Sequence, residues 1–113
     1  MNYIEFSAGN KEYKLRLNTR NTVMLEKQLG CNPLSIFGDG DIIPTVTVMV
    51  AILHASLQQY NHGITLNDAY DIFDTWLGED NSTTDFIPII LEIYKASGII
   101  PKDKVEEEET KNA

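Results

Sequence analysis

Three aspartates recur at every third position of one predicted helix and form the most regular set of chemically capable side chains in the sequence. They are Asp68, Asp71 and Asp74. Paired carboxylates can perform acid–base chemistry or bind a divalent cation. The same spacing is typical of a solvated helix face, where stacked like charges destabilise the helix slightly. We interpret the three as a solvated face, and a cationic partner surface opposite them stays a hypothesis.

Two histidines could serve as bases or metal ligands. His54 falls within a mostly apolar helical segment, where a packed histidine with a backbone carbonyl or a water as its partner is the expected arrangement. His62 follows Asn61 and precedes Gly63, a helix-ending context in which a histidine interacts favourably with the helix dipole. Neither has an acidic partner three or four positions further on, so a shared metal is not expected.

The remaining polar motifs are fragments of known patterns. The runs Asp39-Gly40-Asp41 and Glu79-Asp80-Asn81, the latter with Asp85, resemble parts of calcium loops but lack the full spacing and the distant glutamate. We interpret both as turn and capping chemistry. Cys31 has no basic neighbour in the sequence to activate its thiol, and we expect it to pack at a helix end. No catalytic, cofactor-binding or metal-binding residue is assigned.

Charge is distributed unevenly along the 113 residues, which carry a net charge of −8. Residues 1–30 have a net charge of +2, residues 31–101 of −8 and residues 102–113 of −2, and no lysine or arginine lies between Lys27 and Lys95. Nucleic acids and anionic membranes are bound through such cations, so neither is an expected partner. With one cysteine and no signal-peptide pattern, we expect a protein of a reducing cytosol.

The elements that position these residues begin with a β-hairpin over residues 2–17. Tyr13, Leu15 and Leu17 alternate with Lys14 and Arg16, and residues 8–11 supply the turn. A two-stranded hairpin is marginally stable alone, so we expect helices to cover its apolar face.

Helices are expected after the hairpin. Asn18 or Thr19 caps the first, which Gly30 ends, and Pro33–Phe37 forms a short helical turn. Ile42–Tyr60 is ambiguous because alternating valines resemble a strand, but its length favours a buried central helix with Pro44 in the first turn. Thr65 and Asp68 form a near capping box for the next helix, whose apolar stripe includes Tyr70, Phe73 and Trp76.

Thr84 or Asp85 caps the last helix, and Ser97-Gly98 ends it. Ile99 and Ile100 follow as an apolar strap, which either folds back on the hairpin or forms part of a docking surface. The composition of residues 102–113 predicts a disordered acidic tail. Residues 1–101 are thus expected to form one α+β domain, an N-terminal hairpin packed on about four helices.

Four strings in order resemble the tail assembly chaperones of siphophages and of prophages of Gram-positive bacteria. The strings are Leu25-Glu26-Lys27-Gln28-Leu29-Gly30 with Asn32-Pro33-Leu34, Ile52-Leu53-His54-Ala55-Ser56-Leu57-Gln58, His62-Gly63-Ile64-Thr65, and Ala96-Ser97-Gly98-Ile99-Ile100-Pro101-Lys102. The resemblance depends on their order and spacing, since no single string is diagnostic.

The resemblance implies a protein of the infected host's cytoplasm that is absent from the finished virion. Such chaperones bind the long tape measure protein and help tail-tube subunits polymerise around it, without catalysis. It also implies the shorter, non-frameshifted form. The major tail tube protein and further copies of the chain are additional candidate partners. The alternative function is a structural virion component such as a head–tail adaptor or tail terminator, and an enzyme is the third hypothesis.

Overall fold

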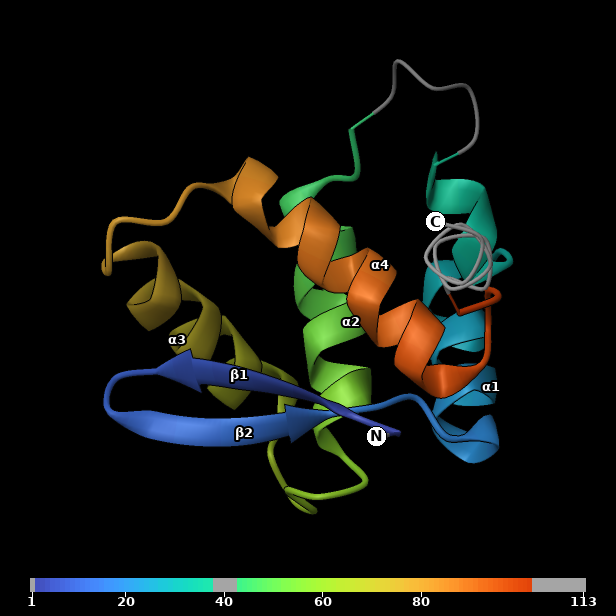
Figure 1. The fold of residues 1–113 in the computed structure, drawn as a ribbon, viewed down its shortest axis with the longest axis horizontal. Helices are drawn as coiled ribbons and strands as arrows, with labels where there is room; N and C mark the ends of the chain where they lie inside the picture. The colour runs from blue at the N-terminus through green and yellow to red at the C-terminus, as the bar shows by residue number, and fades with distance from the viewer. Residues whose placement is uncertain (1, 38–42, 103–113) are drawn as a thin grey trace, which may run out of the picture.

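The chain folds into an N-terminal two-stranded hairpin that packs against α-helices, an α+β arrangement (Figure 1). The computed structural model describes residues 2–37 and 43–102, and the predicted tail, apart from Lys102, lies outside this range. The elements of the described part are β1 Ile4–Ala8, β2 Lys11–Leu15, α1 Thr19–Leu29, the 3₁₀ helix η1 Pro33–Phe37, α2 Val46–Leu57, α3 Leu66–Leu77, the 3₁₀ helix η2 Thr83–Asp85 and α4 Phe86–Ser97.

The hairpin closes through a two-residue turn. Gly9 and Asn10 have positive φ values of 60° and 64°, as a tight turn between twisted strands requires. The strands are antiparallel, with Phe6 opposite Tyr13. The Gly9 N–H donates to both carboxylate oxygens of Glu79, at 3.3 and 3.4 Å, which fixes the turn to the segment after α3. The predicted hairpin and its turn are confirmed.

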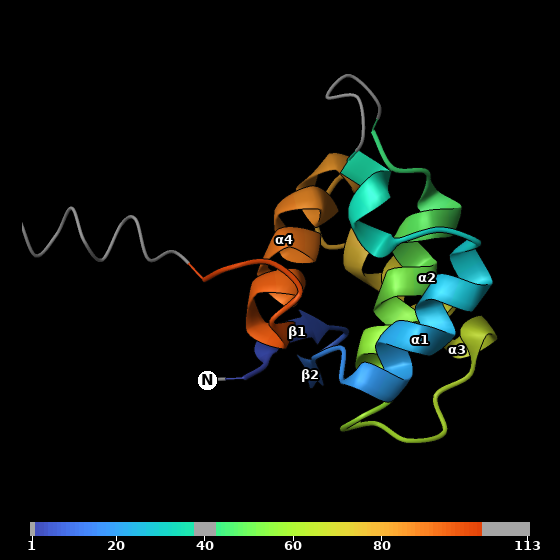
Figure 2. The ribbon, with the colours of Figure 1, turned by 90° about the vertical axis from the view of Figure 1, so that its right-hand side faces the viewer.

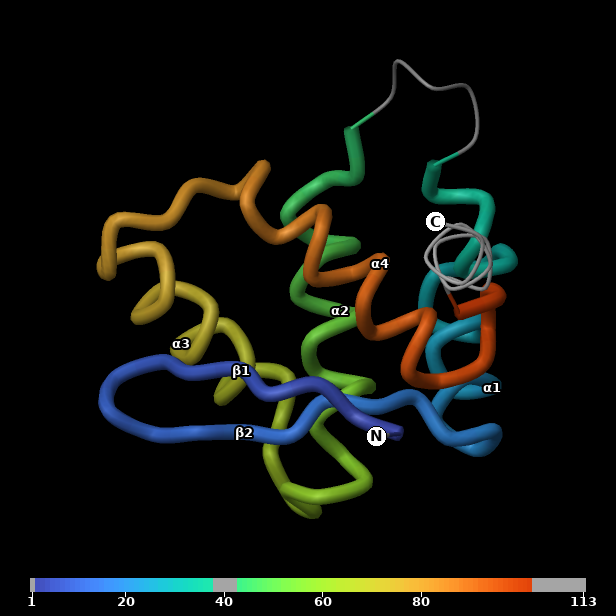
Figure 3. The backbone as a smooth tube through the Cα atoms, viewed as in Figure 1, coloured from blue at the N-terminus to red at the C-terminus, as the bar shows by residue number. Residues whose placement is uncertain are grey.

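Helix α1 begins and ends as its sequence predicts. Asn18 is the N-cap residue, and its side chain accepts a hydrogen bond from the Asn21 N–H at 2.8 Å. Gly30 ends the helix in the left-handed conformation at φ 72°, which glycine adopts without strain. Figure 3 shows α1 and α2 as antiparallel neighbours, and the two helices are in contact.

Helix α2 is the buried central element, as predicted, but its start differs from the prediction. Thr45 is the N-cap residue and accepts from the Val48 N–H at 3.2 Å, so Pro44 lies before the helix rather than in its first turn. A threonine hydroxyl satisfies a free helix donor, which favours a helix start at this position. The predicted start at Ile42 lies outside the described residues.

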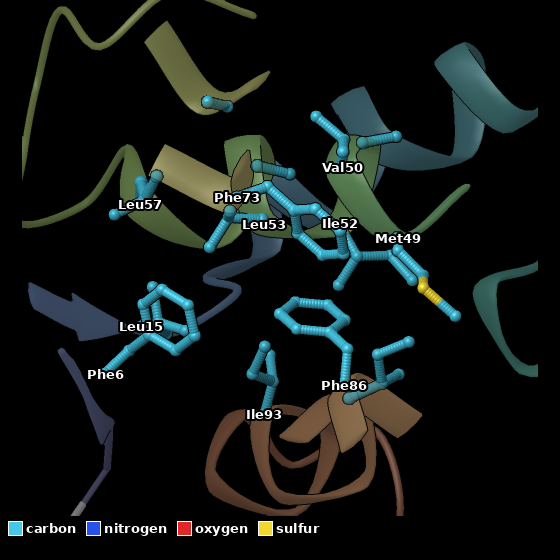
Figure 4. Close-up of a cluster of buried hydrophobic side chains, with 14 of the residues drawn as sticks. Phe6, Leu15, Met49, Val50, Ile52, Leu53, Leu57, Phe73, Phe86 and Ile93 are labelled. Carbon is cyan, nitrogen blue, oxygen red and sulfur yellow. The ribbon is translucent and has the colours of Figure 1, made fainter. Parts of the chain in front are cut away.

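The core forms where α2 meets the hairpin, α1, α3 and α4. Figure 4 shows apolar side chains from the hairpin, α2, α3 and α4 converging, with Phe73 of α3 near Phe86 of α4. Their ring centroids lie 5.2 Å apart, and Phe6 of β1 lies 5.8 Å from Trp76. Aromatic pairs at such distances stabilise a core beyond the burial of their area. The residues with no exposed surface include Leu15, Leu25, Ile52, Leu53, Leu57, Phe86, Ile90 and Ile93.

The start of α4 also differs in detail. Asp85 precedes the helix, but its carboxylate accepts a hydrogen bond from the Ser82 N–H at 2.8 Å and so belongs to η2. The prediction that Thr84 or Asp85 caps α4 is thus confirmed in position, since Asp85 is the N-cap residue, but its side chain makes no capping hydrogen bond to α4. Pro88 lies in the first turn, where its missing N–H is tolerated. Gly98 ends α4 at φ 77°.

Candidate functional site

An open cleft of about 660 Å³ lies between β2, the α2–α3 connection and α3. Tyr13, Ile64 and Ile72 supply its apolar surface. Its polar lining residues are Lys11, Glu12, Asn61, His62, Asp68 and Asp71. The fold thus brings His62 close to two of the α3 aspartates, a proximity that the sequence did not reveal because the α2–α3 connection has to turn the chain first.

Asp68 has a structural task at the start of α3. Its carboxylate accepts a hydrogen bond from the Thr65 N–H at 2.9 Å, while the Thr65 hydroxyl accepts from the Asp68 N–H at 3.1 Å. The predicted capping box is confirmed. The backbone and side-chain hydrogen bonds from Thr65 lower the pKa of Asp68, which favours the ionised form that the capping box uses.

The other α3 aspartates, Asp71 and Asp74, are exposed, in agreement with the predicted solvated face. The described part of the chain contains no group of three histidines, cysteines or carboxylates placed to hold a metal ion. Of the three aspartates, Asp74 alone is not among the lining residues of the cleft.

The two histidines lie in different environments. His54 is half-buried on α2, and its ring makes no hydrogen bond to any other described residue. Its backbone carbonyl accepts from Gln58 Nε2 at 3.0 Å. His62 is exposed in the turn after α2. Packing is thus confirmed for His54, but without the backbone partner that the sequence suggested as one option.

The second acidic run performs turn chemistry, as predicted. Glu79 accepts the hydrogen bonds from the Gly9 N–H in the hairpin turn. In addition, Asn81 Nδ2 donates to the Trp76 carbonyl at 2.9 Å. Asp80 adopts a positive φ of 65°, which places it in the tight turn after α3. The run Asp39-Gly40-Asp41 lies outside the described residues.

Two predicted core residues are exposed instead. Cys31 is a free, exposed thiol that directly follows the left-handed Gly30. Tyr70 is 45% exposed, whereas Phe73 and Trp76 are buried. The inward face of α3 follows Ala69, Phe73 and Trp76 at spacings of four and three, which leaves Tyr70 at its margin.

The strap Ile99-Ile100 turns back over the end of α4. The Ile99 N–H donates to the Tyr94 carbonyl at 2.9 Å, and both isoleucines are half-buried against the core. Ile99 lines a cleft of about 340 Å³ together with Leu17 and α1 residues, including Val23. The strap therefore folds toward α1 and the end of the hairpin. The hypothesis that Ile99 and Ile100 form part of a docking surface now concerns only the surface that these two residues leave exposed.

Exposed apolar side chains lie on α1, on η1, and at and just before the start of α2, elements that share one side of the molecule in Figure 2. Of the eight large hydrophobic residues exposed in the described part, five belong to this group. We call them the α1–α2 surface: Val23, Met24, Leu34, Ile43 and Val46. The signal in the sequence was the triplet Val23-Met24-Leu25, since three consecutive residues of one helix cannot all face the same core.

The last two helices, α3 and α4, expose fewer large apolar side chains than the α1–α2 surface does. There, α3 exposes Tyr70 and α4 exposes Leu91, while Phe86, Ile90, Ile93 and Tyr94 are buried. Most of the large apolar side chains of α4 therefore pack in or against the core, with Leu91 as the exposed one. Consequently the larger share of exposed apolar side chains precedes residue 47.

The described residues form a small α+β domain that carries a polar cleft beside β2 and the exposed apolar residues of the α1–α2 surface, and no described helix is long and apolar enough to cross a bilayer. The chain belongs to a family of unknown function, DUF6096, which matches residues 4–113. No curated protein and no solved structure matches the chain.

Proposed function

We propose that this protein is a phage tail assembly chaperone that binds the tape measure protein and promotes assembly of the tail tube around it, without catalysis. The observation that carries the proposal is the α1–α2 surface. Its residues are 40–59% exposed, which leaves their apolar side chains available to an apolar segment of a client. The resemblance of the four sequence strings to tail assembly chaperones supplies the client.

The charge distribution supports this assignment. A chaperone must remain dissolved while it exposes apolar side chains, and a net charge of −8 favours solubility. The exposed aspartates of α3 contribute to this charge away from the apolar residues. On this view the cytoplasm of the infected host is the site of action, and the protein leaves the tail before the virion is complete.

Co-expression with the tape measure protein tests the proposal. The expected result is a soluble complex that co-purifies, whereas the tape measure protein alone aggregates. A control with an unrelated long helical protein separates specific binding from general solubilisation. Persistent aggregation with no co-purification refutes the proposal.

The alternative is a structural component of the virion, such as a head–tail adaptor or tail terminator. Mass spectrometry of purified particles separates the two functions, because a chaperone is absent from the particle. A stoichiometric amount of this chain in mature virions would establish the alternative.

A further inference from the structure

The outer edge of β2 is an unpaired strand edge. Within the described part of the chain, the sheet contains β1 and β2 only, so β2 has a strand neighbour on one side. Ala8 and Lys11 are the pair that flanks the turn. Since hydrogen-bonded and non-hydrogen-bonded pairs alternate along an antiparallel ladder, every second residue of β2 directs its backbone groups away from β1.

The contact of Arg16 identifies which residues point outward. Just beyond β2, the Arg16 N–H donates to the Ser56 carbonyl of α2 at 2.9 Å, on the side away from β1. By the alternation, Glu12 and Lys14 share this outward direction. These two residues therefore offer N–H and C=O groups that a further strand could pair with.

The three residues at this edge read Glu12-Tyr13-Lys14, and this sequence is self-complementary in charge. If a second β2 pairs antiparallel about a two-fold axis at Tyr13, Glu12 faces Lys14 of the second copy, and Lys14 faces Glu12 of the second copy. We propose that a second copy of this chain pairs with the outer edge of β2 in this register, forming a four-stranded sheet across a symmetric dimer.

The side chains fit the pairing. Glu12 and Lys14 are exposed on the same face of the strand, so that opposite charges meet across the new ladder on one face. The Lys14 ammonium lies 4.9 Å from the centre of the Tyr3 ring and 5.7 Å from that of Tyr60, and these contacts hold the long side chain on that face. Tyr13 points to the other face and would meet Tyr13 of the second copy there; because Glu12 and Tyr13 both line the cleft, the cleft runs along the edge that pairs.

The fold also limits the length of this ladder. At Arg16 the edge is already occupied, because the backbone bonds to Ser56 and Arg16 Nη1 donates to Gln59 Oε1 at 3.0 Å. Only the segment around Tyr13 can pair, so the dimer is a weak one that forms at high protein concentration. The pairing is independent of the proposed chaperone function, since none of its residues belongs to the α1–α2 surface.

Charge reversal in the full chain tests the register. The variants are Glu12→Lys, Lys14→Glu and the double change, with Glu26→Lys and Lys27→Glu of α1 as controls that alter the net charge equally. Circular dichroism verifies the fold of each, and sedimentation velocity measures association over a concentration series reaching the millimolar range. Each single change at the edge places like charges opposite each other twice and should weaken dimerisation roughly tenfold.

The double change restores opposite charges and should restore the wild-type dimer. An equimolar mixture of the two single edge variants should form a heterodimer, because the first presents two lysines where the second presents two glutamates. Controls should associate like wild type. A wild-type protein that stays monomeric throughout the series overturns the proposal, as does a dimer that the edge variants leave unchanged.

Discussion

The buried hydroxyl of Tyr94 in α4 donates to the carbonyl of Pro33 in η1 at 3.0 Å, across a sequence separation of 61 residues. The ring centroid of Phe37 lies 6.1 Å from that of Tyr94. Through this contact α4 holds η1, and with it Leu34, in a fixed position beside α1. One tyrosine therefore links the core to the apolar surface proposed to bind the client.

Replacing Tyr94 with phenylalanine should lower the free energy of unfolding by about 1–2 kcal/mol, because the buried Pro33 carbonyl loses its donor. Urea denaturation followed by circular dichroism measures this change. Tyr70→Phe is the matched control, since Tyr70 is exposed and its hydroxyl makes no hydrogen bond to another described residue. The free energy of unfolding of this control should differ from wild type by no more than about 0.5 kcal/mol. Equal effects of the two changes would contradict the assignment.

Tyr94 also predicts a loss of stability in alkali. Burial, with a smaller contribution from Cys31, raises the pKa of Tyr94 in the folded protein above its ordinary value. The stabilisation is thus fully present below pH about 10, where the unfolded tyrosine is still protonated, and declines as the pH rises further. The stability difference between wild type and Tyr94→Phe should narrow above this pH in denaturation curves. A constant difference up to pH about 11 would be the contrary result.

Asp68 predicts a loss of stability in acid, at the other end of the pH range from Tyr94. Its pKa is lowered by the Thr65 hydrogen bonds, so the stability that it contributes is present above the ordinary pKa of an aspartate and is lost as the pH falls through the lowered pKa. Asp68→Asn should lower the melting temperature at neutral pH, and the deficit should shrink in acid. Asp71→Asn, outside the capping box, should change the neutral melting temperature little. An Asp68→Asn protein as stable as wild type at neutral pH would show that the cap contributes nothing.

Gly9→Ala should destabilise the hairpin by about 1–2 kcal/mol from its left-handed conformation alone. The added Cβ would also meet Thr75 Cγ2 at 3.0 Å, which adds a steric cost. In a Thr75→Ala background the cost of Gly9→Ala should fall, and a double-mutant cycle by chemical denaturation measures the coupling. Gly98→Ala is the control, because φ is 77° there but nothing lies within 4 Å of the new Cβ. If the free-energy costs of Gly9→Ala and Thr75→Ala are additive, the steric contact between the new Cβ and Thr75 Cγ2 is excluded.

Much of the architecture follows from local sequence. The turn residues Gly9 and Asn10, the cap Asn18 and the terminators Gly30 and Gly98 each act within a few positions of themselves, so their effects can be predicted without knowledge of the fold. The central position of α2 follows equally from its nearly continuous apolar composition. The predicted α+β class is confirmed on these grounds.

The features that escaped prediction depend on contacts between distant residues. The Leu17 N–H donates to Ser97 Oγ at 2.8 Å, and these residues are 80 positions apart. The exposure of Tyr70 depends on how wide a face of α3 its neighbours cover: Ala69, Phe73 and Trp76 are buried, while Tyr70 at the margin of this face is exposed. The cleft beside β2 is lined by Lys11, His62 and Asp71, and it exists only because the hairpin lies against α3. Sequence periodicity contains no such information.

The central claim is that the α1–α2 surface binds a protein client. The most direct test compares wild type, the variant Val23→Ser/Met24→Ser and the control Gln28→Ala, each co-expressed with the tape measure protein. These three positions are all exposed on α1, so the changes should leave the core intact.

The measurement is the amount of soluble tape measure protein that co-purifies per molecule of this protein, with the melting temperature of each variant as the check on folding. Wild type and Gln28→Ala should retain the client, and Val23→Ser/Met24→Ser should lose most of it. A folded Val23→Ser/Met24→Ser variant that retains the client as well as wild type does would contradict the claim.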